Sequence, residues 1–263
     1  MGTLTFIGMG LYDEKGISLR GLEAARSAHT VMLEGYTNLM PGLRLDALEA
    51  LLGKMPLLLS RGAVEDGGEI LRAAEERDVA FLVAGDPFIA TTHVDLRLRA
   101  ARRGIRVEVV NAPSIISVAP GAAGLQNYKF GKSATITFPP PQSDVPYDTL
   151  KMNRAAGLHT LFFLDLRAEE GQFMTANEGL RLLLDAERRR GEGAFAPGTL
   201  SVAIARAGGP EQLVRAGTAE ALSGESFGKP PHSLIIPGRL HFMESDALVA
   251  FAGADRALVR GCE

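Results

Sequence analysis

The sequence predicts an α/β protein made of two domains. Short apolar runs of strand type alternate with helical patterns from the first residues onward, which is typical of a parallel sheet covered by helices on both faces. This alternation breaks near residue 112, and the second half of the chain follows a different pattern. A length of 263 residues suits one large domain or two small ones, at roughly 100–200 residues per domain. We therefore expect an N-terminal α/β domain at 1–112 and a C-terminal α/β domain at 113–263.

The N-terminal domain is expected to hold five strands with helices between them. Apolar runs predict strands at 4–8, 30–33, 56–59, 79–84 and 105–110. Ser18 is placed to cap a first helix in which Leu19, Leu22 and Ala25 share one face. Helical spacing predicts further helices at 43–52, around 70–76, and from Thr91 or Thr92 to 102–104.

The C-terminal domain opens with a glycine- and alanine-rich stretch at 114–124, and three prolines at 139–141 mark an extended surface loop. Strands are predicted at 160–164, 200–205 and 233–236, with helices at 175–190 and from about 243 to 252. Two further strand-like runs, 133–138 and 213–217, show no long helical pattern before the next strand. We therefore expect a mixed sheet in this half.

Composition excludes several classes of protein. Hydrophobic residues make up 46% and charged residues 22% of the chain, as in ordinary globular proteins. A net charge of −3 gives no bulk attraction to nucleic acid or to an anionic membrane. No apolar run approaches the roughly 18 residues of a membrane span, and the N-terminus reads as a strand rather than a signal peptide. The single cysteine, Cys262, cannot form an internal disulfide, so we expect a cytoplasmic protein.

The sequence offers no familiar catalytic or metal-binding constellation. Its five histidines show neither the spacing of HExxH nor a cluster with cysteine, so no metal site is predicted. The one thiol stands next to the C-terminal residue, so no cysteine nucleophile is predicted. We assign no catalytic residue. His232, which enters a predicted strand after two prolines, is either a ligand contact or, as single histidines more often are, a structural group.

Four segments follow predicted strand ends, where ligands bind in open α/β sheets. They are rich in small residues, which let a ligand approach the backbone, and they lie at 8–11, 85–87, 113–115 and 205–208. The first contains GxG, but the third glycine of a dinucleotide-binding fingerprint is replaced by Asp13, so a plain tight turn is favoured. Asp86 either starts a turn before Pro87 or accepts a bond from a ribose hydroxyl or an amine.

A basic run follows the fourth strand. Its members are Arg97, Arg99, Arg102, Arg103 and Arg106. Such a run is usually a solvated helix face, and the less favoured alternative is a docking patch for an acidic protein.

A series of longer motifs resembles the diphthine synthases. In chain order they are FIGMGLYD, GDPFIATTHVDLRLRA, NAPSIISVA, YKFGKSAT, GLHTLFFLDL, MTANEGLRLLL, ARAG and PPHSLIIPGRLHFME. The resemblance runs from Phe6 to about Glu244 without a large insertion. YKFGKSAT and GLHTLxFLD are specific to this branch, whereas the GxG and GDP elements are shared with the wider tetrapyrrole methylases. The segment 139–146 matches poorly.

The resemblance implies two α/β domains of the tetrapyrrole methylase type, with S-adenosylmethionine bound in the cleft between them. The implied acceptor is the amino group of a 3-amino-3-carboxypropyl histidine on translation elongation factor 2, and the implied assembly is a homodimer. Archaeal members stop at trimethylation, giving diphthine, and eukaryotic members also methylate the carboxylate. The cofactor-binding positions that it implies are Leu11, Asp86, Ile89, Ser114, Ile115, Leu164, Ala207 and His232.

Two alternative functions remain open from the sequence. A tetrapyrrole methylase would share the fold and the methyl donor, and the branch-specific motifs argue against it. A nicotinamide-dependent oxidoreductase, or a non-catalytic nucleotide-binding module, would use the same strand-end turns. The missing third glycine argues against the nicotinamide version.

Overall fold

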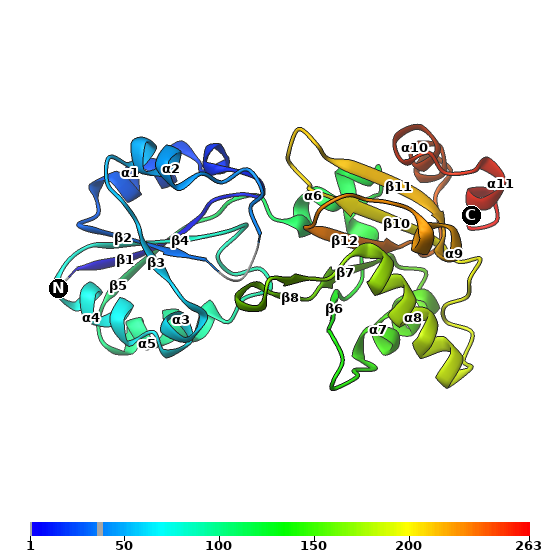
Figure 1. Cartoon of the computed structure of the whole chain (residues 1–263), viewed down its shortest axis with the longest axis horizontal. Helices are drawn as coiled ribbons and strands as arrows, with labels where there is room; N and C mark the ends of the chain where they lie inside the picture. Colours follow the sequence, from blue (N-terminus) through cyan, green and yellow to red (C-terminus); the bar gives the residue numbers. More distant parts are fainter. Residues whose placement is uncertain (1, 36–38) are drawn as a thin grey trace. The chain divides into compact units, whose positions relative to one another are not determined.

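The structure is a computed structural model that describes residues 2–35 and 39–263. The chain divides into two compact units, Met1–Ile115 and Ile116–Glu263. Each unit is built around its own five-stranded sheet (Figure 1).

The first unit is a parallel sheet with the strand order β3-β2-β4-β1-β5. Its strands are β1 (Thr3–Gly8), β2 (Thr30–Glu34), β3 (Leu57–Leu59), β4 (Val79–Val83) and β5 (Arg106–Val110). Its helices are α1 (Leu19–Ser27), α2 (Leu45–Leu52), α3 (Arg61–Asp66), α4 (Gly68–Glu76) and α5 (His93–Arg102). Figure 1 shows α1 and α2 on one face of the sheet and α3, α4 and α5 on the other. The predicted parallel sheet with helices on both faces is confirmed.

Successive side chains of the central strands point to opposite faces of this sheet, so a core lies on each face. Phe6 and Phe81 belong to one core, while their neighbours Ile7 and Leu82 belong to the other. Every residue of β4 is buried, as expected for a central parallel strand.

Of the three residues predicted to share one face of α1, Ala25 is buried, whereas the Leu19 side chain is 80% exposed. The helix α1 instead contacts the sheet through Gly21, where an added Cβ would lie 2.8 Å from Cγ2 of Ile7. This close approach turns Leu19, in the first helical turn, toward solvent. Ser18 does cap the helix as predicted, since its Oγ accepts a hydrogen bond from the Gly21 N–H at 3.1 Å.

The second unit is a mixed sheet with the order β11-β10-β12-β7-β6, which confirms the prediction for this half. Only β6 (Ala134–Ile136) and β7 (Thr160–Leu164) pair in parallel among these strands. The strands β10 (Leu200–Ala205), β11 (Leu213–Thr218) and β12 (His232–Ile236) complete it with antiparallel pairs. A separate two-stranded ribbon joins β8 (Leu166–Arg167) to β9 (Gln172–Phe173).

The helices of this unit are α6 (Ile115–Ala123), α7 (Val145–Ala155), α8 (Ala176–Arg190), α9 (Ala219–Gly224), α10 (Phe242–Ala252) and α11 (Arg256–Arg260). The expectation of no long helix between 133–138 and the next strand is wrong, because α7 lies there and allows β6 and β7 to run parallel. Pro146, at the end of the poorly matched segment, occupies the first turn of α7, where proline is well tolerated. Figure 1 shows α7 and α8 together on one face of the sheet.

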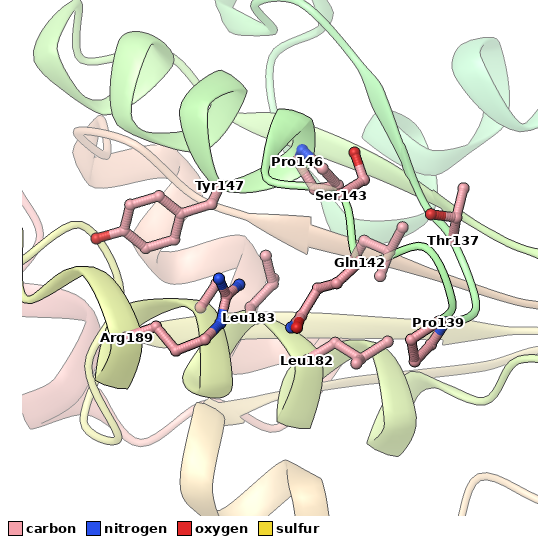
Figure 2. Close-up of a pocket in the computed structure, with 11 residues that line it drawn as sticks. Thr137, Pro139, Gln142, Ser143, Pro146, Tyr147, Leu182, Leu183 and Arg189 are labelled. Carbon is pink, nitrogen blue, oxygen red and sulfur yellow. The ribbon is translucent and has the colours of Figure 1, made fainter.

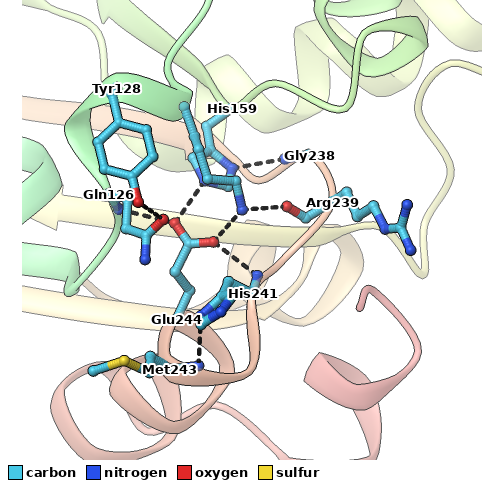
Figure 3. A network of polar contacts seen from close by, with 9 residues as sticks. Gln126, Tyr128, His159, Gly238, Arg239, His241, Met243 and Glu244 are labelled. Carbon is cyan, nitrogen blue, oxygen red and sulfur yellow. Dashed lines mark hydrogen bonds and ion pairs between the residues drawn. The ribbon is translucent and has the colours of Figure 1, made fainter.

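A buried polar network fastens the segment before α10 to the rest of the second unit (Figure 3). The Glu244 carboxylate accepts hydrogen bonds from the backbone N–H groups of Gln126 at 2.8 Å and His241 at 2.9 Å. It also forms an ion pair with Lys129 and accepts a bond from Nε2 of His159 at 3.0 Å. The other ring nitrogen of His159 accepts the backbone N–H of Gly238 at 3.0 Å. These partners show that His159 is a neutral imidazole with its proton on Nε2.

The surroundings of this network lower the pKa values of both Glu244 and His159. Burial alone would raise the pKa of Glu244, but Lys129 and the hydrogen bonds outweigh it and lower that pKa from 4.5 to about 2. Burial lowers the pKa of His159 below its usual 6.5, with Glu244 opposing the shift. Both groups are 1% exposed or less on their side chains.

In the part of the chain that the structure describes, no helix is long and apolar enough to cross a membrane. Within the same residues, no group of three His, Cys, Asp or Glu side chains is arranged to hold a metal ion.

Candidate functional site

Three predicted segments of the first unit meet at the carboxyl edge of its parallel sheet. The register pairs Gly8 with Val83 and Ile7 with Val110, so β1, β4 and β5 end side by side. The loops that leave these ends carry the predicted residues Leu11, Asp86, Ile89, Ser114 and Ile115. This edge is where ligands bind in open α/β sheets.

Glycines make the first of these loops a tight turn. Gly10 and Gly85 exchange two backbone hydrogen bonds, with N···O distances of 3.3 and 2.7 Å. A Cβ on Gly8 would lie 2.6 Å from the Gly85 carbonyl oxygen and 2.6 Å from Cβ of Ala112. The chain then forms a short 3₁₀ helix at Glu14–Gly16, whose start Asp13 caps, and α1 begins only at Leu19. A dinucleotide fingerprint opens straight into its helix, so the structure favours the tight turn.

Asp86 connects the loop after β4 to the loop after β5. Its buried carboxylate accepts a hydrogen bond from the Phe88 N–H at 3.0 Å, which forms the turn predicted at Asp86-Pro87. The second oxygen accepts bonds from Nδ2 of Asn111 at 2.9 Å and the Ala112 N–H at 3.4 Å. The carboxylate therefore fixes the backbone that leads to Ser114.

The predicted residues of the second unit also meet at one sheet edge. The strand β12 begins at His232, which pairs with Ala205 at the end of β10. The next residue of β12, Ser233, pairs with Phe163, so Leu164 at the end of β7 lies beside the same edge. Ala207 follows β10 by two residues and is buried.

The His232 ring is held by contacts within the fold. Its Nδ1 accepts the Ala176 N–H, in the first turn of α8, at 3.1 Å, and Nε2–H donates to the Lys229 carbonyl at 3.2 Å. Burial lowers the pKa of His232 to about 4, and Arg206 adds to the shift. The ring is thus neutral near pH 7 and positions the start of α8. A ligand contact of His232 stays a prediction.

Two residues with an unusual backbone conformation lie in the loops that carry Ile89 and Ala207. Within residues 2–35 and 39–263, Ala90 and Arg206 are the non-glycine residues with positive φ, at 55° and 49°. They directly adjoin the predicted Ile89 and Ala207. Such conformations cost about 1–3 kcal/mol and persist where the surrounding structure enforces them, often at ligand sites. The Arg206 guanidinium supplies such enforcement, since Nη1 donates to the carbonyls of Phe227 at 2.6 Å and Lys229 at 2.7 Å. The sequence carries no glycine or asparagine at either position to signal this.

The apolar members of the predicted set keep surface for a ligand. Leu11, Ile89, Ile115 and Leu164 are half-buried. An adenosyl group and a methionine chain need apolar walls beside backbone hydrogen-bonding groups, and the residues at the strand ends supply both kinds of group. The residues therefore fit S-adenosylmethionine.

Two hollows in the second unit involve other residues. Figure 2 shows a narrow pocket between α8 and the segment from β6 to α7, with Tyr147, Gln142 and Arg189 on its walls. A shallower hollow at the start of α8 is lined by residues such as Asn177 and Arg181. None of the eight predicted residues lines either one.

The basic run of the first unit has acidic or aromatic neighbours for most of its members. Arg99 pairs with Asp95, Arg103 with Glu75 and Arg106 with Glu108. The guanidinium of Arg97 lies over the Phe88 ring, 5.3 Å from its centroid. These contacts favour the solvated-face interpretation over a docking patch.

Comparison with known proteins identifies the class to which this fold and these edges belong. Residues 3–223 match the family of Tetrapyrrole (Corrin/Porphyrin) Methylases. A relative from Methanosarcina barkeri, named diphthine synthase, is 48% identical over 99% of this chain and 100% of its own length. A diphthine synthase from Methanocella arvoryzae is 50% identical over 95% of this chain and 98% of its own.

A solved structure agrees with these relatives. The crystal structure of a diphthine synthase superposes with a TM-score of 0.90 and 36% identity, covering 98% of this chain and 99% of that one. The chain belongs to the tetrapyrrole methylase family and, within it, to the diphthine synthase branch. It is therefore a methyltransferase, and the predicted fold class is confirmed.

Proposed function

We propose that this protein is the methyltransferase of diphthamide biosynthesis that makes diphthine. It transfers methyl groups from S-adenosylmethionine to the amino group of the 3-amino-3-carboxypropyl histidine on translation elongation factor 2. Near-complete coverage of relatives named diphthine synthase supports this over a tetrapyrrole substrate. Three methyl transfers, a homodimer and a cytoplasmic location complete the proposal.

The donor is assigned to two sets of residues. In the N-terminal domain, 1–112, these are Leu11, Asp86 and Ile89. In the C-terminal domain, 113–263, they are Ser114, Ile115, Leu164, Ala207 and His232. The observation that carries this assignment is the positive φ of Ala90 and Arg206, beside Ile89 and Ala207, because backbone strain of this kind is maintained at functional loops.

The chain's part in the reaction is to hold two reactants in line. S-adenosylmethionine, when bound, supplies a methyl group already activated on a sulfonium. Backbone groups at Ser114, Ile115 and Ala207 orient the donor, and the half-buried Leu11, Ile89 and Leu164 keep water from it. Such positioning contributes roughly 7–11 kcal/mol to catalysis. An α-amino group has a pKa of about 7.7–8.0, so part of the acceptor is neutral near pH 7 and the first methyl transfer needs no dedicated base.

Mass spectrometry tests the reaction. Elongation factor 2 that carries the unmethylated histidine adduct is incubated with this protein and S-adenosylmethionine. Three added methyl groups are the expected result. Four, one of them labile to base, would indicate the eukaryotic pattern, and none would refute the proposal.

Calorimetry tests the donor site. Asp86→Ala removes the carboxylate that ties the loop after β4 to Asn111 and Ala112, so we expect weaker binding of S-adenosylhomocysteine. The loss of two or three hydrogen bonds to a charged group corresponds to at least roughly tenfold in affinity. Asp46→Ala, at an exposed ion pair with Arg44, is the matched control and should bind as the unmodified protein does. Unchanged affinity of folded Asp86→Ala would remove Asp86 from the site.

A further inference from the structure

A buried pair of ionisable side chains lies beneath the loop that carries Asp86 and Ile89. Glu34 ends β2 and His93 begins α5, and their side chains are 0% and 2% exposed. Nε2 of His93 lies 3.2 Å from Oε1 of Glu34, and Nδ1 lies 2.8 Å from the Pro87 carbonyl oxygen. Neither side chain reaches solvent, so neither can touch a substrate.

The geometry points to Glu34 and His93 as a positioning pair that holds the 85–92 loop in its ligand-binding shape. This inference rests on the proposed function, because the ligand that the loop is taken to bind is the methyl donor.

The hydrogen-bond partners fix which nitrogen carries a proton. A carbonyl oxygen only accepts, so Nδ1 of His93 must donate to Pro87. Nε2 then either donates to the Glu34 carboxylate or accepts from a protonated Glu34 carboxyl group. In both states Glu34 keeps the Nδ1 proton directed at Pro87. Without Glu34, a neutral imidazole can move its single proton to Nε2 and leave two acceptors facing each other.

The Pro87 carbonyl closes the loop around its strained residue. It accepts a second hydrogen bond from Oγ1 of Thr91 at 2.8 Å. Thr91 and His93 both follow Ala90, whose φ is 55°, while Pro87 precedes it. Two bonds across Ala90 therefore hold a backbone shape that alanine on its own disfavours.

Aromatic packing places the ring but does not replace its hydrogen bonds. His93 meets Phe81 edge-on at 5.3 Å and Phe6 at 6.4 Å between ring centroids. A phenylalanine at position 93 would keep these contacts and lose the bond to Pro87. Among residues 2–35 and 39–263, Oε2 of Glu34 has no hydrogen-bond partner. Replacing such an incompletely satisfied buried pair with apolar residues is often neutral or stabilising, so stability alone does not account for it.

Three variants separate positioning from packing. His93→Phe removes the bond to Pro87, and Glu34→Met removes the group that sets the tautomer. Glu34→Gln is the conservative control, because its amide N–H can donate to Nε2 and leave the Nδ1 proton on Pro87. Hydrogen exchange of the peptide spanning 85–92 is measured without ligand, alongside calorimetric binding of S-adenosylhomocysteine and the urea midpoint.

For His93→Phe and Glu34→Met we expect loop exchange and the dissociation constant each to rise roughly tenfold, as for the loss of one hydrogen bond. Glu34→Gln should stay within about twofold of the unmodified protein. Unchanged exchange and affinity in His93→Phe would overturn the inference, and so would a Glu34→Gln defect as large as that of Glu34→Met. If the unmodified protein fails to bind S-adenosylhomocysteine, the proposed function fails, while loop exchange still decides whether the pair positions the loop.

Discussion

Replacing Glu244 by glutamine tests how much one buried carboxylate contributes to the second unit. The change keeps the size of the side chain and removes its charge. Each carboxylate oxygen accepts two bonds, Oε1 from the Gln126 N–H and His159, and Oε2 from Lys129 and the His241 N–H. The amide nitrogen replaces one of these oxygens, so its N–H groups face two donors in a buried site.

Two estimates of the cost agree. Removing one partner of a buried ion pair costs about 3–5 kcal/mol. The pKa of Glu244 falls from 4.5 to about 2 in the folded protein, and at about 1.4 kcal/mol for each pKa unit this corresponds to about 3 kcal/mol. We expect Glu244→Gln to lower the free energy of unfolding by about 3 kcal/mol at pH 7.

The pH dependence follows from the direction of the shift. A carboxylate whose folded pKa is lowered stabilises the fold above its unfolded value of 4.5, and this contribution is lost as the pH falls toward 2. The loss of unfolding free energy in Glu244→Gln, relative to the unmodified protein, should therefore be largest at pH 7 and smaller at pH 3. His159, whose pKa burial lowers from 6.5, acts in the same direction by weakening the fold as the pH falls below that value.

Urea unfolding followed by circular dichroism measures the loss, and hydrogen exchange of peptides from β12 assigns it to the second unit. Glu220→Gln, at an exposed residue in the first turn of α9, is the control and should change stability by no more than about 0.5 kcal/mol. A loss under about 1 kcal/mol for Glu244→Gln at pH 7, or an equal loss at pH 3, would refute the reasoning.

Two further substitutions test the strand-end edges. Gly8→Ala places a Cβ 2.6 Å from the Gly85 carbonyl oxygen and should lower stability by about 1–3 kcal/mol in urea unfolding. Gly62→Ala, where nothing lies within 4 Å of the added Cβ, should be neutral or stabilising, and an equal loss in both would contradict the steric explanation. His232→Phe keeps the edge contact with Phe227 but leaves the Ala176 N–H without its acceptor. It should lower the urea midpoint by an amount equal to about 1–3 kcal/mol, and a midpoint that does not move would show that the ring does not secure the start of α8.

Most strands could be predicted from the sequence, because they are short continuous apolar runs. The run at 160–164 is a strand with the predicted bounds, and the helix at 175–190 begins at the cap Thr175. The helix α7 could not be predicted, because prolines and polar residues around Pro146 obscure its helical spacing. The exposure of Leu19 could not be predicted, because the helix–sheet contact runs through Gly21, a residue that apolar periodicity does not detect.

The loops of the candidate site were predictable for a similar physical reason. Parallel strands end at one edge, so segments at 8–11, 85–87 and 113–115 had to meet. The contact between Glu34 and His93 was not predictable, because the two residues are 59 positions apart and only the sheet order brings them together. The positive φ of Ala90 occurs in a loop whose Pro87 carbonyl accepts hydrogen bonds from Thr91 and His93, and alanine itself gives no sign of it.

The place of β12 bears on how the chain folds as it is synthesised. All five strands of the first sheet lie before residue 111, so this unit can close while the rest of the chain is still on the ribosome. In the second sheet, β12 joins β10 to β7 and ends at Ile236. Until those late residues emerge, β10 and β7 lack the strand that pairs with both of them in the complete sheet. The C-terminal unit thus depends on completed translation, and a chain cut short before 232 would leave aggregation-prone strands exposed.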